Sequence, residues 1–413
     1  MHRQIQTILT TTLALAVFLS ACSPQATPAV LTTPTQAAYP AATKVGEANQ
    51  NGYPVQQATA VPTAQANGDS EMISDKPRIT DPQVDAETMQ ALAKANTALA
   101  MNLYQALREK DANIFFSPYS IYLALAMTSA GASDETLQQL LNVLDWQLTP
   151  ADLHAAVNAL DQQLQAAPSE EGGLQLTIAN SLWGQSGYPF TQSFLDTLAQ
   201  YYGSGLQTVD FADADPVRQT INQWVADQTH NKIQDLFPQG SITAATRLVL
   251  ANAIYFKAAW MHQFTAEQTQ DGDFTLTDGS TKTVPMMHQT DSFGYFAGQG
   301  YQAVNLPYSD GSTSMLILMP AAGSLDQFES NLTADVLQKT IDGLSTAEVR
   351  LSMPLFKIES SFDLGSTLTQ LGMDAAFDPQ KADFSAMDGS HDLSISSVVH
   401  KAYVNVAEEG TEA

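Results

Sequence analysis

The sequence is poor in cysteine and in positive charge. The first shortage excludes internal disulfides, and the second argues against two classes of binding partner. Cys22 is the only cysteine among 413 residues, so no disulfide can form within the chain. Lysine and arginine number 17 against 43 acidic residues, a formal net charge of −26, and neither occurs between Lys110 and Arg218. Nucleic acids and anionic lipid surfaces both need clustered positive charge. The sequence therefore predicts neither as a partner, and its acidity is typical of a solvated surface.

Motifs for catalysis and metal binding are also missing. The 7 histidines are scattered, none stands beside a Gly-x-Ser-x-Gly, and His-Glu-x-x-His does not occur. A serine hydrolase with a nucleophile elbow would need the Gly-x-Ser-x-Gly motif, and a zinc peptidase would need His-Glu-x-x-His. The sequence thus predicts neither an enzyme, nor a bound metal, nor a cofactor.

Residues 1–21 have the pattern of an export signal. Arg3 precedes a largely apolar stretch, Ile8 to Leu19, that is too short and too often interrupted by Thr to form a stable membrane span. The stretch ends in Leu-Ser-Ala-Cys at Cys22, which is similar to the signal of bacterial lipoproteins, where the Cys is diacylated. We expect an exported protein held on the outer side of the membrane only by lipid on Cys22. A plain signal peptide with an incidental cysteine is the alternative.

Residues 22–85 change in composition to Ala, Thr, Gln and Pro, without a periodic apolar face. Such a segment cannot bury enough apolar surface to offset its chain entropy, so the sequence predicts a flexible linker. Residues 86–413 remain, which is long enough for one large domain.

Within this domain, helical periodicity comes first and strand-like runs come later. The patterns predict helices at 87–109, 120–130, 134–144, 150–164 and 215–236, and strands at 248–256, 314–319, 349–353 and 393–406. The run from Ser120 to Ala130 is apolar nearly all round, which marks a buried helix. Helices and mostly antiparallel strands without a β-α-β rhythm favour an α+β fold.

Several segments, in order and spacing, resemble one known family, the serpins. They are Asn113-Ile-Phe-Phe-Ser-Pro-Tyr-Ser-Ile121, Leu250-Ala-Asn-Ala-Ile-Tyr-Phe-Lys257 with Trp260, Val284-Pro-Met-Met-His288, Leu371-Gly-Met373, Ala382-Asp-Phe-Ser385, Ile395-Ser396, Val399-His-Lys-Ala402 and Glu408-Glu-Gly-Thr-Glu-Ala413. Together they cover the whole predicted domain. The resemblance implies a serpin fold, with N-terminal helices around a large mixed main sheet and smaller antiparallel sheets.

The resemblance also implies roles for buried polar residues. By similarity, Ser117, Ser120, Asn252 and His400 form a hydrogen-bonded cluster, called the shutter, under the main sheet where two strands part. Trp260 is similar to the aromatic residue at the top of that sheet, the breach, where insertion begins. Without the resemblance, His400 and Trp260 would be taken as ordinary core residues.

Residues 408–413 (Glu408, Glu409, Gly410, Thr411, Glu412 and Ala413) resemble the hinge of an inhibitory reactive loop. In serpins a protease cuts this loop, is held as an acyl-enzyme, and is displaced as the loop enters the sheet as a new strand. Alternation along a strand would face Thr411 and Ala413 inward and Glu412 outward. Gly410 would leave the backbone free to turn into the sheet. The resemblance therefore implies a monomeric inhibitor of a serine or cysteine protease.

The chain departs from the family pattern in several places. Asn405 and Ala407 replace the usual acidic and Asn-like residues before the hinge, and Leu355 stands where many serpins have a Lys that could pair with Glu408. Residues 150–164 contain acidic residues but neither Lys nor Arg, which argues against activation by a heparin-type polyanion. The chain as written stops at Ala413, inside the loop, so the cleaved bond and the family's last strands are absent from it.

Two other interpretations stay open. A non-inhibitory serpin-fold protein would act as a binding module or chaperone. If Ala413 is the natural C-terminus, an inactive truncated serpin is expected, because there is no bond for a protease to acylate.

Overall fold

The computed structural model describes residues 15–18, 70–109, 112–165 and 174–413. Contacts divide the chain into two units, residues 1–22 with 68–413 and residues 23–67. The second unit lies outside the described residues, as does Cys22. Among the described residues, no helix combines the length and the apolarity needed to cross a membrane.

The helices concentrate in the N-terminal half. They are α1 (Ala86–Leu107), α2 (Pro118–Ser129), α3 (Asp134–Val143), α4 (Pro150–Gln165), α5 (Gln192–Thr197), the π-helical turn η1 (Leu198–Tyr202), α6 (Ala214–Gln228), α7 (Leu325–Ser330), α8 (Ala334–Asp342), α9 (Gly365–Gln370) and α10 (Ser385–Asp388), with short 3-10 turns η2 (Phe211–Asp213), η3 (Ala266–Gln268) and η4 (Ala375–Phe377). Helix α2 starts at Pro118 after Ser117, whose hydroxyl accepts a hydrogen bond from the Ser120 N–H at 3.3 Å. All its residues except Pro118 are buried, as its uniformly apolar sequence predicts.

The strands form two sheets. The larger has the order β11-β12-β13-β5-β3-β4-β2, and the smaller has the order β1-β9-β8-β7-β10 with β6 paired to β7. The strand bounds are β1 (Leu15–Phe18), β2 (Ser70–Met72), β3 (Gln175–Gln185), β4 (Leu206–Val209), β5 (Leu248–Ala259), β6 (Gln270–Thr275), β7 (Thr281–Ala297), β8 (Tyr301–Pro307), β9 (Ser314–Pro320), β10 (Ser345–Pro354), β11 (Phe356–Asp363), β12 (Ser397–Val406) and β13 (Gly410–Glu412). Parallel pairs β3–β4 and β5–β12 make the larger sheet mixed. The α+β class predicted from the sequence is confirmed.

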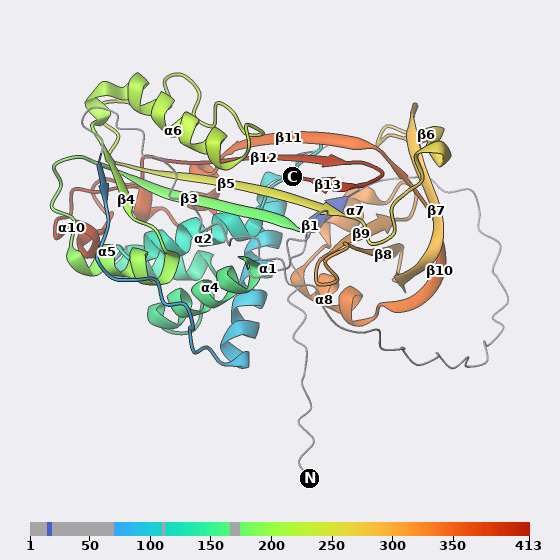
Figure 1. Cartoon of the computed structure of the whole chain (residues 1–413), viewed down its shortest axis with the longest axis horizontal. Helices are drawn as coiled ribbons and strands as arrows, with labels where there is room; N and C mark the ends of the chain where they lie inside the picture. The colour runs from blue at the N-terminus through green and yellow to red at the C-terminus, as the bar shows by residue number, and fades with distance from the viewer. Residues whose placement is uncertain (1–14, 19–69, 110–111, 166–173) are drawn as a thin grey trace, which may run out of the picture. The chain divides into compact units, whose positions relative to one another are not determined.

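Helices cover both faces of the larger sheet. Figure 1 shows α6 on one face and α2, α4 and α5 on the other. Strand β5 is consequently buried on both faces for most of its length, which explains its continuous apolar sequence. The core on the α2 side is built from α1, α2, α4 and the sheet, while Phe211, Ile221 and Val225 fill the space under α6.

Two predicted elements end elsewhere than expected. The helix predicted for 215–236 stops at Gln228, because Thr229 folds back to cap the turn and His230 and Asn231 adopt positive φ. The strand predicted for 393–406 begins only at Ser397, since the Ile395 N–H donates to the Ala376 carbonyl outside the sheet.

The N-terminal boundaries also differ from the prediction. Residues 70–72, within the range predicted as a linker, form β2, which pairs antiparallel with β4. Residues 15–18, part of the predicted export signal, form β1, which pairs in parallel with β9 at the edge of the smaller sheet.

Candidate functional site: the gap between strands β5 and β12

Three polar side chains lie in one row across the larger sheet. Asn180 of β3 is opposite Asn252 of β5, and Asn252 is opposite His400 of β12. Residues directly opposite on neighbouring strands present their side chains on the same face. We call Asn180, Asn252 and His400 the polar row. It lies against the start of α2.

His400 is fully buried and uses both ring nitrogens. Its Nε2 accepts a hydrogen bond from the Ser117 backbone N–H at 3.0 Å, so the proton must be on Nδ1, which donates to Asn252 Oδ1 at 2.7 Å. The ring is therefore neutral. Burial lowers the pKa of His400 to about 3, because a charged ring would lose its hydration.

Asn252 connects His400 to α2 and β3. Its Nδ2 donates to the Ser120 carbonyl and to Asn180 Oδ1. Ser120, predicted as a member of the cluster, contributes its backbone carbonyl, while its buried hydroxyl has no hydrogen-bond partner among the described residues. Asn180 was not predicted, since only strand pairing brings it opposite Asn252.

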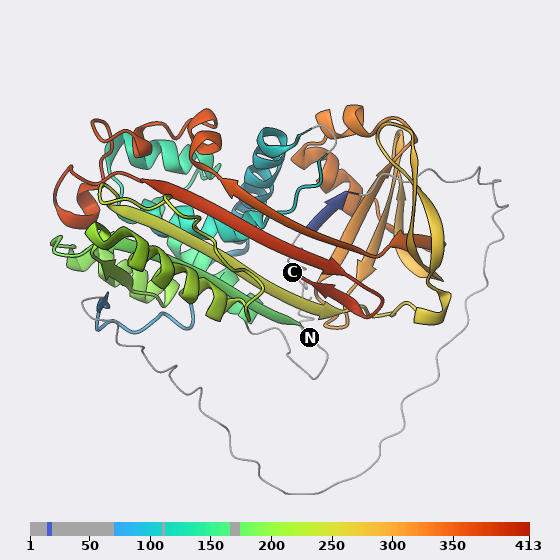
Figure 2. The ribbon, with the colours of Figure 1, turned by 90° about the horizontal axis from the view of Figure 1, so that it is seen from above.

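Strands β5 and β12 part immediately beyond the polar row. They pair in parallel from Ser397↔Val249 to His400↔Asn252 and no further. Above this point β13 lies between them, antiparallel to both, with Thr411 opposite Val406 of β12 and Ala258 of β5. Figure 2 shows β13 between the ends of β12 and β5. The predicted hinge is thus already a short strand of the sheet.

The hinge residues alternate in orientation as the sequence predicts. Thr411 and Ala413 are buried, and the Thr411 hydroxyl accepts a hydrogen bond from the Tyr308 hydroxyl at 2.8 Å. Ala413 and Phe256 exchange two backbone hydrogen bonds of 2.6 Å, which continue the ladder past β13. Ala413 belongs to the buried apolar cluster that also contains Phe256 and Tyr308.

Glu412 points to the other face, toward the segment that follows α6. Lys232 Nζ donates to Glu412 Oε2 at 2.8 Å, and the Tyr255 hydroxyl donates to Oε1 at 3.0 Å. Partial burial alone would raise the pKa of Glu412, but these hydrogen bonds and the charge of Lys232 outweigh it, and the pKa is lowered. The carboxylate is therefore ionised and held.

Trp260 covers the turn between β12 and β13. Its Nε1 donates to the Ala407 carbonyl at 2.9 Å, its backbone N–H donates to the Glu409 carbonyl at 2.9 Å, and its ring stacks on Tyr308 at 4.7 Å. Glu408, which lacks the familiar Lys partner, instead accepts a hydrogen bond from Thr269 Oγ1 at 2.8 Å. The predicted breach residue and the predicted hinge are therefore in direct contact.

Glycine is required at position 410 because the backbone there passes close to β5, not because of a turn. A Cβ on this residue would lie 2.1 Å from the Ala258 carbonyl oxygen of β5. Its φ is not positive, so the free turning expected from the sequence is not what the glycine supplies. It lets the hinge backbone enter beside β5.

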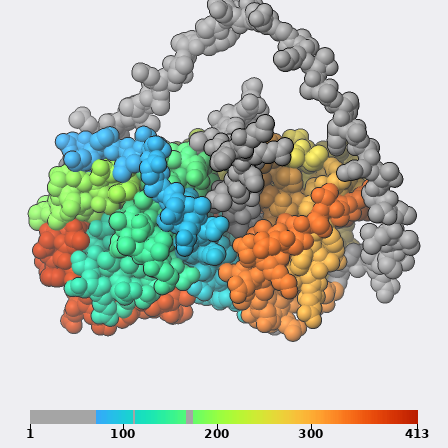
Figure 3. Space-filling model, turned by 90° about the horizontal axis from the view of Figure 1, so that it is seen from below, coloured from blue at the N-terminus to red at the C-terminus, as the bar shows by residue number. Residues whose placement is uncertain are grey.

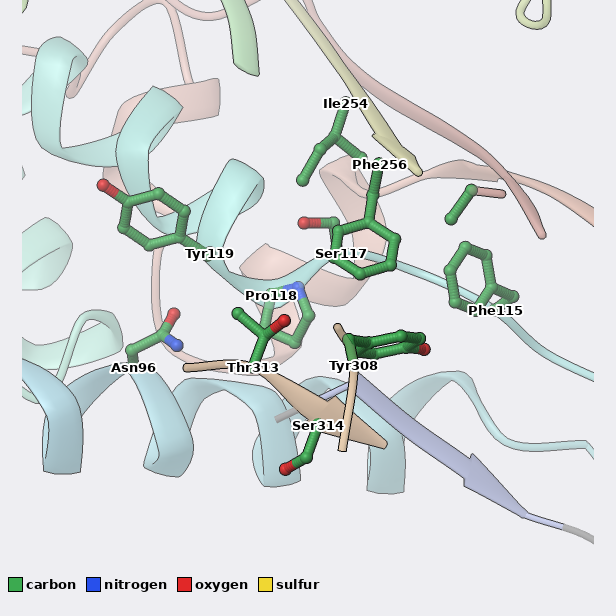
Figure 4. Close-up of a pocket in the computed structure, with 11 residues that line it drawn as sticks. Asn96, Phe115, Ser117, Pro118, Tyr119, Ile254, Phe256, Tyr308, Thr313 and Ser314 are labelled. Atoms are coloured by element: carbon green, nitrogen blue, oxygen red, sulfur yellow. The ribbon is translucent and has the colours of Figure 1, made fainter. Parts of the chain in front are cut away.

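A small cavity lies ahead of Ala413, between β5 and the start of α2. Its volume is about 40 Å³, enough for a water molecule, and Figure 4 shows Phe256, Tyr308 and Ser117 facing it. The lining is mainly apolar. The next inward side chain of a strand continuing from Ala413 would point toward this space.

Comparison with known proteins agrees with this geometry. The family model described as "Serpin (serine protease inhibitor)" matches residues 94–413. The chain belongs to the serpin family. Leukocyte elastase inhibitor A of Mus musculus is 40% identical over 338 residues, covering 79% of this chain and 88% of the relative, and Serpin B4 of Homo sapiens is 39% identical over 344 residues, covering 79% and 88%.

Solved serpin structures share the fold. Ovalbumin from emu (Dromaius novaehollandiae) superposes with a TM-score of 0.73 at 29% identity, covering 78% of this chain and 88% of ovalbumin. Reactive-loop-cleaved human thyroxine binding globulin gives a TM-score of 0.72 at 29% identity, covering 79% and 96%. A serpin fold with helices around a mixed sheet is therefore confirmed for this chain.

Proposed function

We propose that this protein is a protease inhibitor that traps a serine or cysteine protease as an acyl-enzyme while its cleaved loop enters the larger sheet. One observation carries the proposal: β13 already occupies the gap between β5 and β12, with Thr411 and Ala413 buried and Glu412 outside. The bond attacked by the protease lies C-terminal to Ala413 in this proposal. Several relatives are named as elastase inhibitors, which supports the same function.

The sheet is arranged so that insertion can proceed from the hinge downward. Opening the gap further requires breaking the β5–β12 pairing at residues 397–400 and the Asn252–His400 hydrogen bond. A new strand between them would then form two ladders in place of one, each hydrogen bond contributing about 0.5–1.5 kcal/mol net. The polar row is the point where this exchange of partners starts.

A charge at an inward hinge position tests the proposal. In the protein with its complete loop, Thr411→Arg would force a guanidinium into the buried position beside Tyr308, so insertion should slow and the acyl-enzyme should hydrolyse first. We expect cleaved protein instead of detergent-stable complexes with a serine protease. Thr411→Ser keeps the hydroxyl and serves as the control. Unchanged complex formation by Thr411→Arg would refute the insertion mechanism.

A non-inhibitory binding module is the alternative, and one relative favours it. Thyroxine binding globulin shares the fold, and its name describes it as a ligand-binding protein. In that case the parent protein would form no complexes with proteases. Thr411→Arg would change neither this result nor ligand binding.

We further propose that Cys22 carries the lipid that anchors the protein outside the cell. The support is the Leu-Ser-Ala-Cys sequence and the absence of any other thiol in the chain. Two acyl chains suffice for stable anchoring. Cys22→Ala should move the protein from the membrane fraction into the medium, whereas Ser20→Ala should not. Retention of Cys22→Ala in membranes would contradict the proposal.

A further inference from the structure

The segment before α1 is docked on the domain rather than free. Residues 70–79, which we call the clasp, begin with β2, whose three residues pair antiparallel with β4 at the edge of the larger sheet. Figure 3 shows this blue segment running over the green elements at one side of the domain. The composition of residues 70–85 gave no sign of this docking.

Arg78 fixes the clasp to helix α4. Its Nε donates to Asn158 Oδ1 at 3.0 Å, and its guanidinium forms an ion pair with Asp161, a side chain that is nine-tenths buried. The carbonyl of Ile79 accepts hydrogen bonds from Asn158 Nδ2 at 2.8 Å and from Gln162 Nε2 at 2.7 Å. Charge-assisted, two-armed contacts of this kind specify arginine rather than lysine.

The same segment is also held by the elements between β3 and β4. The Ser74 hydroxyl donates to the Asp196 carboxylate of α5, and the Ile79 N–H donates to the Gln200 carbonyl of η1 at 2.9 Å. The clasp therefore bridges two groups of elements: β4, α5 and η1 on one side and α4 on the other.

Two glycines make room for the clasp. A Cβ on Gly203 would lie 2.9 Å from Arg78 Cδ, and Gly203 has a φ of +61°. A Cβ on Gly205 would lie 2.8 Å from Ile73 Cγ1 and 2.9 Å from the Met72 carbonyl oxygen. Since any larger residue would displace residues 72–78, the turn before β4 is fitted to this segment.

The clasp also reaches the polar row. Arg78, Asp161 and Asn180 all line one cavity of about 60 Å³. Asn180 accepts the hydrogen bond from Asn252, whose other contact is His400. The cavity thus adjoins the docked arginine and, through Asn180, the polar row.

We propose that the groove between α4 and the α5–η1 turn is an internal docking site for Arg78 and Ile79, and that docking of the clasp restrains opening of the β5–β12 gap. A strand added in that gap moves the half of the sheet containing β3 and β4 by about 4.8 Å relative to β12. Helix α4 packs on α1 and α2, and α2 is hydrogen-bonded to His400 and Asn252. Movement of β4 past α4 would stretch the clasp between its two attachments. This restraint rests on the proposed insertion, but the docking itself does not.

Hydrogen–deuterium exchange on the full chain tests the proposal without a protease, so failure of the inhibitory function would not affect the result. Arg78→Ala should accelerate exchange at least about 10-fold, equivalent to about 1.4 kcal/mol, at residues 206–209 and also at residues 397–400. Arg78→Lys should give a smaller increase. Arg108→Ala, which removes a surface ion pair with Asp326, is the matched control and should change neither region.

A second variant releases the other end of the clasp. Glu71→Pro leaves Arg78 in place but disrupts the pairing of β2 with β4, and it should accelerate exchange at 397–400 as Arg78→Ala does. Residues 301–307 of β8, in the other sheet, report global destabilisation and should stay unchanged. Faster exchange at 206–209 alone would overturn the restraint and leave only local docking, and no change in either region would overturn the docking site as well.

Discussion

The buried histidine of the polar row makes stability depend on pH in a defined direction. His400 is neutral and fully buried, with a pKa lowered to about 3, whereas a histidine in the unfolded chain titrates near 6.5. Below pH 6.5 the unfolded chain binds a proton that the folded protein does not. The stabilisation is therefore complete above about pH 6.5 and is lost as the pH falls from 6.5 toward 3.

The expected size follows from these two values. Each pH unit in this interval costs about 1.4 kcal/mol, so His400 should remove about 2 kcal/mol between pH 7.5 and pH 5. His154 contributes in the same direction, because burial lowers its pKa to about 4. The protein should thus lose about 4 kcal/mol of unfolding free energy over this range, half of it through each ring.

Urea unfolding of the full chain at several pH values measures this loss. His400→Asn cannot titrate but keeps a donor near Asn252 Oδ1, so the loss between pH 7.5 and 5 should fall to about 2 kcal/mol. Asn180→Ala is the control: it removes a neighbour in the polar row and should lower stability without changing the pH dependence. An identical pH dependence in His400→Asn and the parent protein would refute the buried, neutral state of His400.

Two further substitutions test the geometry of the site. Asn252→Ala removes the acceptor for the buried His400 Nδ1–H and should cost about 2–4 kcal/mol and promote polymers seen by size exclusion; a change under about 0.5 kcal/mol would contradict the hydrogen bonding described for the row. Gly410→Ala would place a Cβ against the Ala258 carbonyl and should expel β13, making residues 407–413 sensitive to limited proteolysis, whereas Ala407→Gly should not; a protected Gly410→Ala hinge would show that the approach to β5 is not tight.

The sequence predicted those parts of the site in which a local pattern carries the information. The nearly uniformly apolar run from Ser120 to Ala130 predicted a buried helix, and alternation after Gly410, in a segment that resembles a serpin hinge, predicted the orientation of Thr411 and Glu412. In both cases neighbours along the chain suffice, because helix and strand periodicities are local.

The parts that were missed depend on contacts between distant segments. Asn180 became part of the polar row only through its register with β5, 72 residues away. The clasp was not predicted because three residues of strand and a single partly buried Arg78 leave no periodic signal in a segment rich in polar residues. The prediction that the helix reaches Leu236 was wrong. Ile233 and Leu236 have helical spacing and are buried, but they lie in the turns after α6.

The polar row also fixes the register between β5 and β12, which their apolar sequences alone would not determine. Strands β5 and β12 are both apolar and pair over only four residues, so many alignments would bury similar surface. A slip of one residue would turn His400 to the other face, and a slip of two would place Val398 or Ala402 opposite Asn252, with no ring nitrogen for the Ser117 N–H. The row therefore sets the register, since only one of these alignments gives both ring nitrogens of His400 their hydrogen bonds.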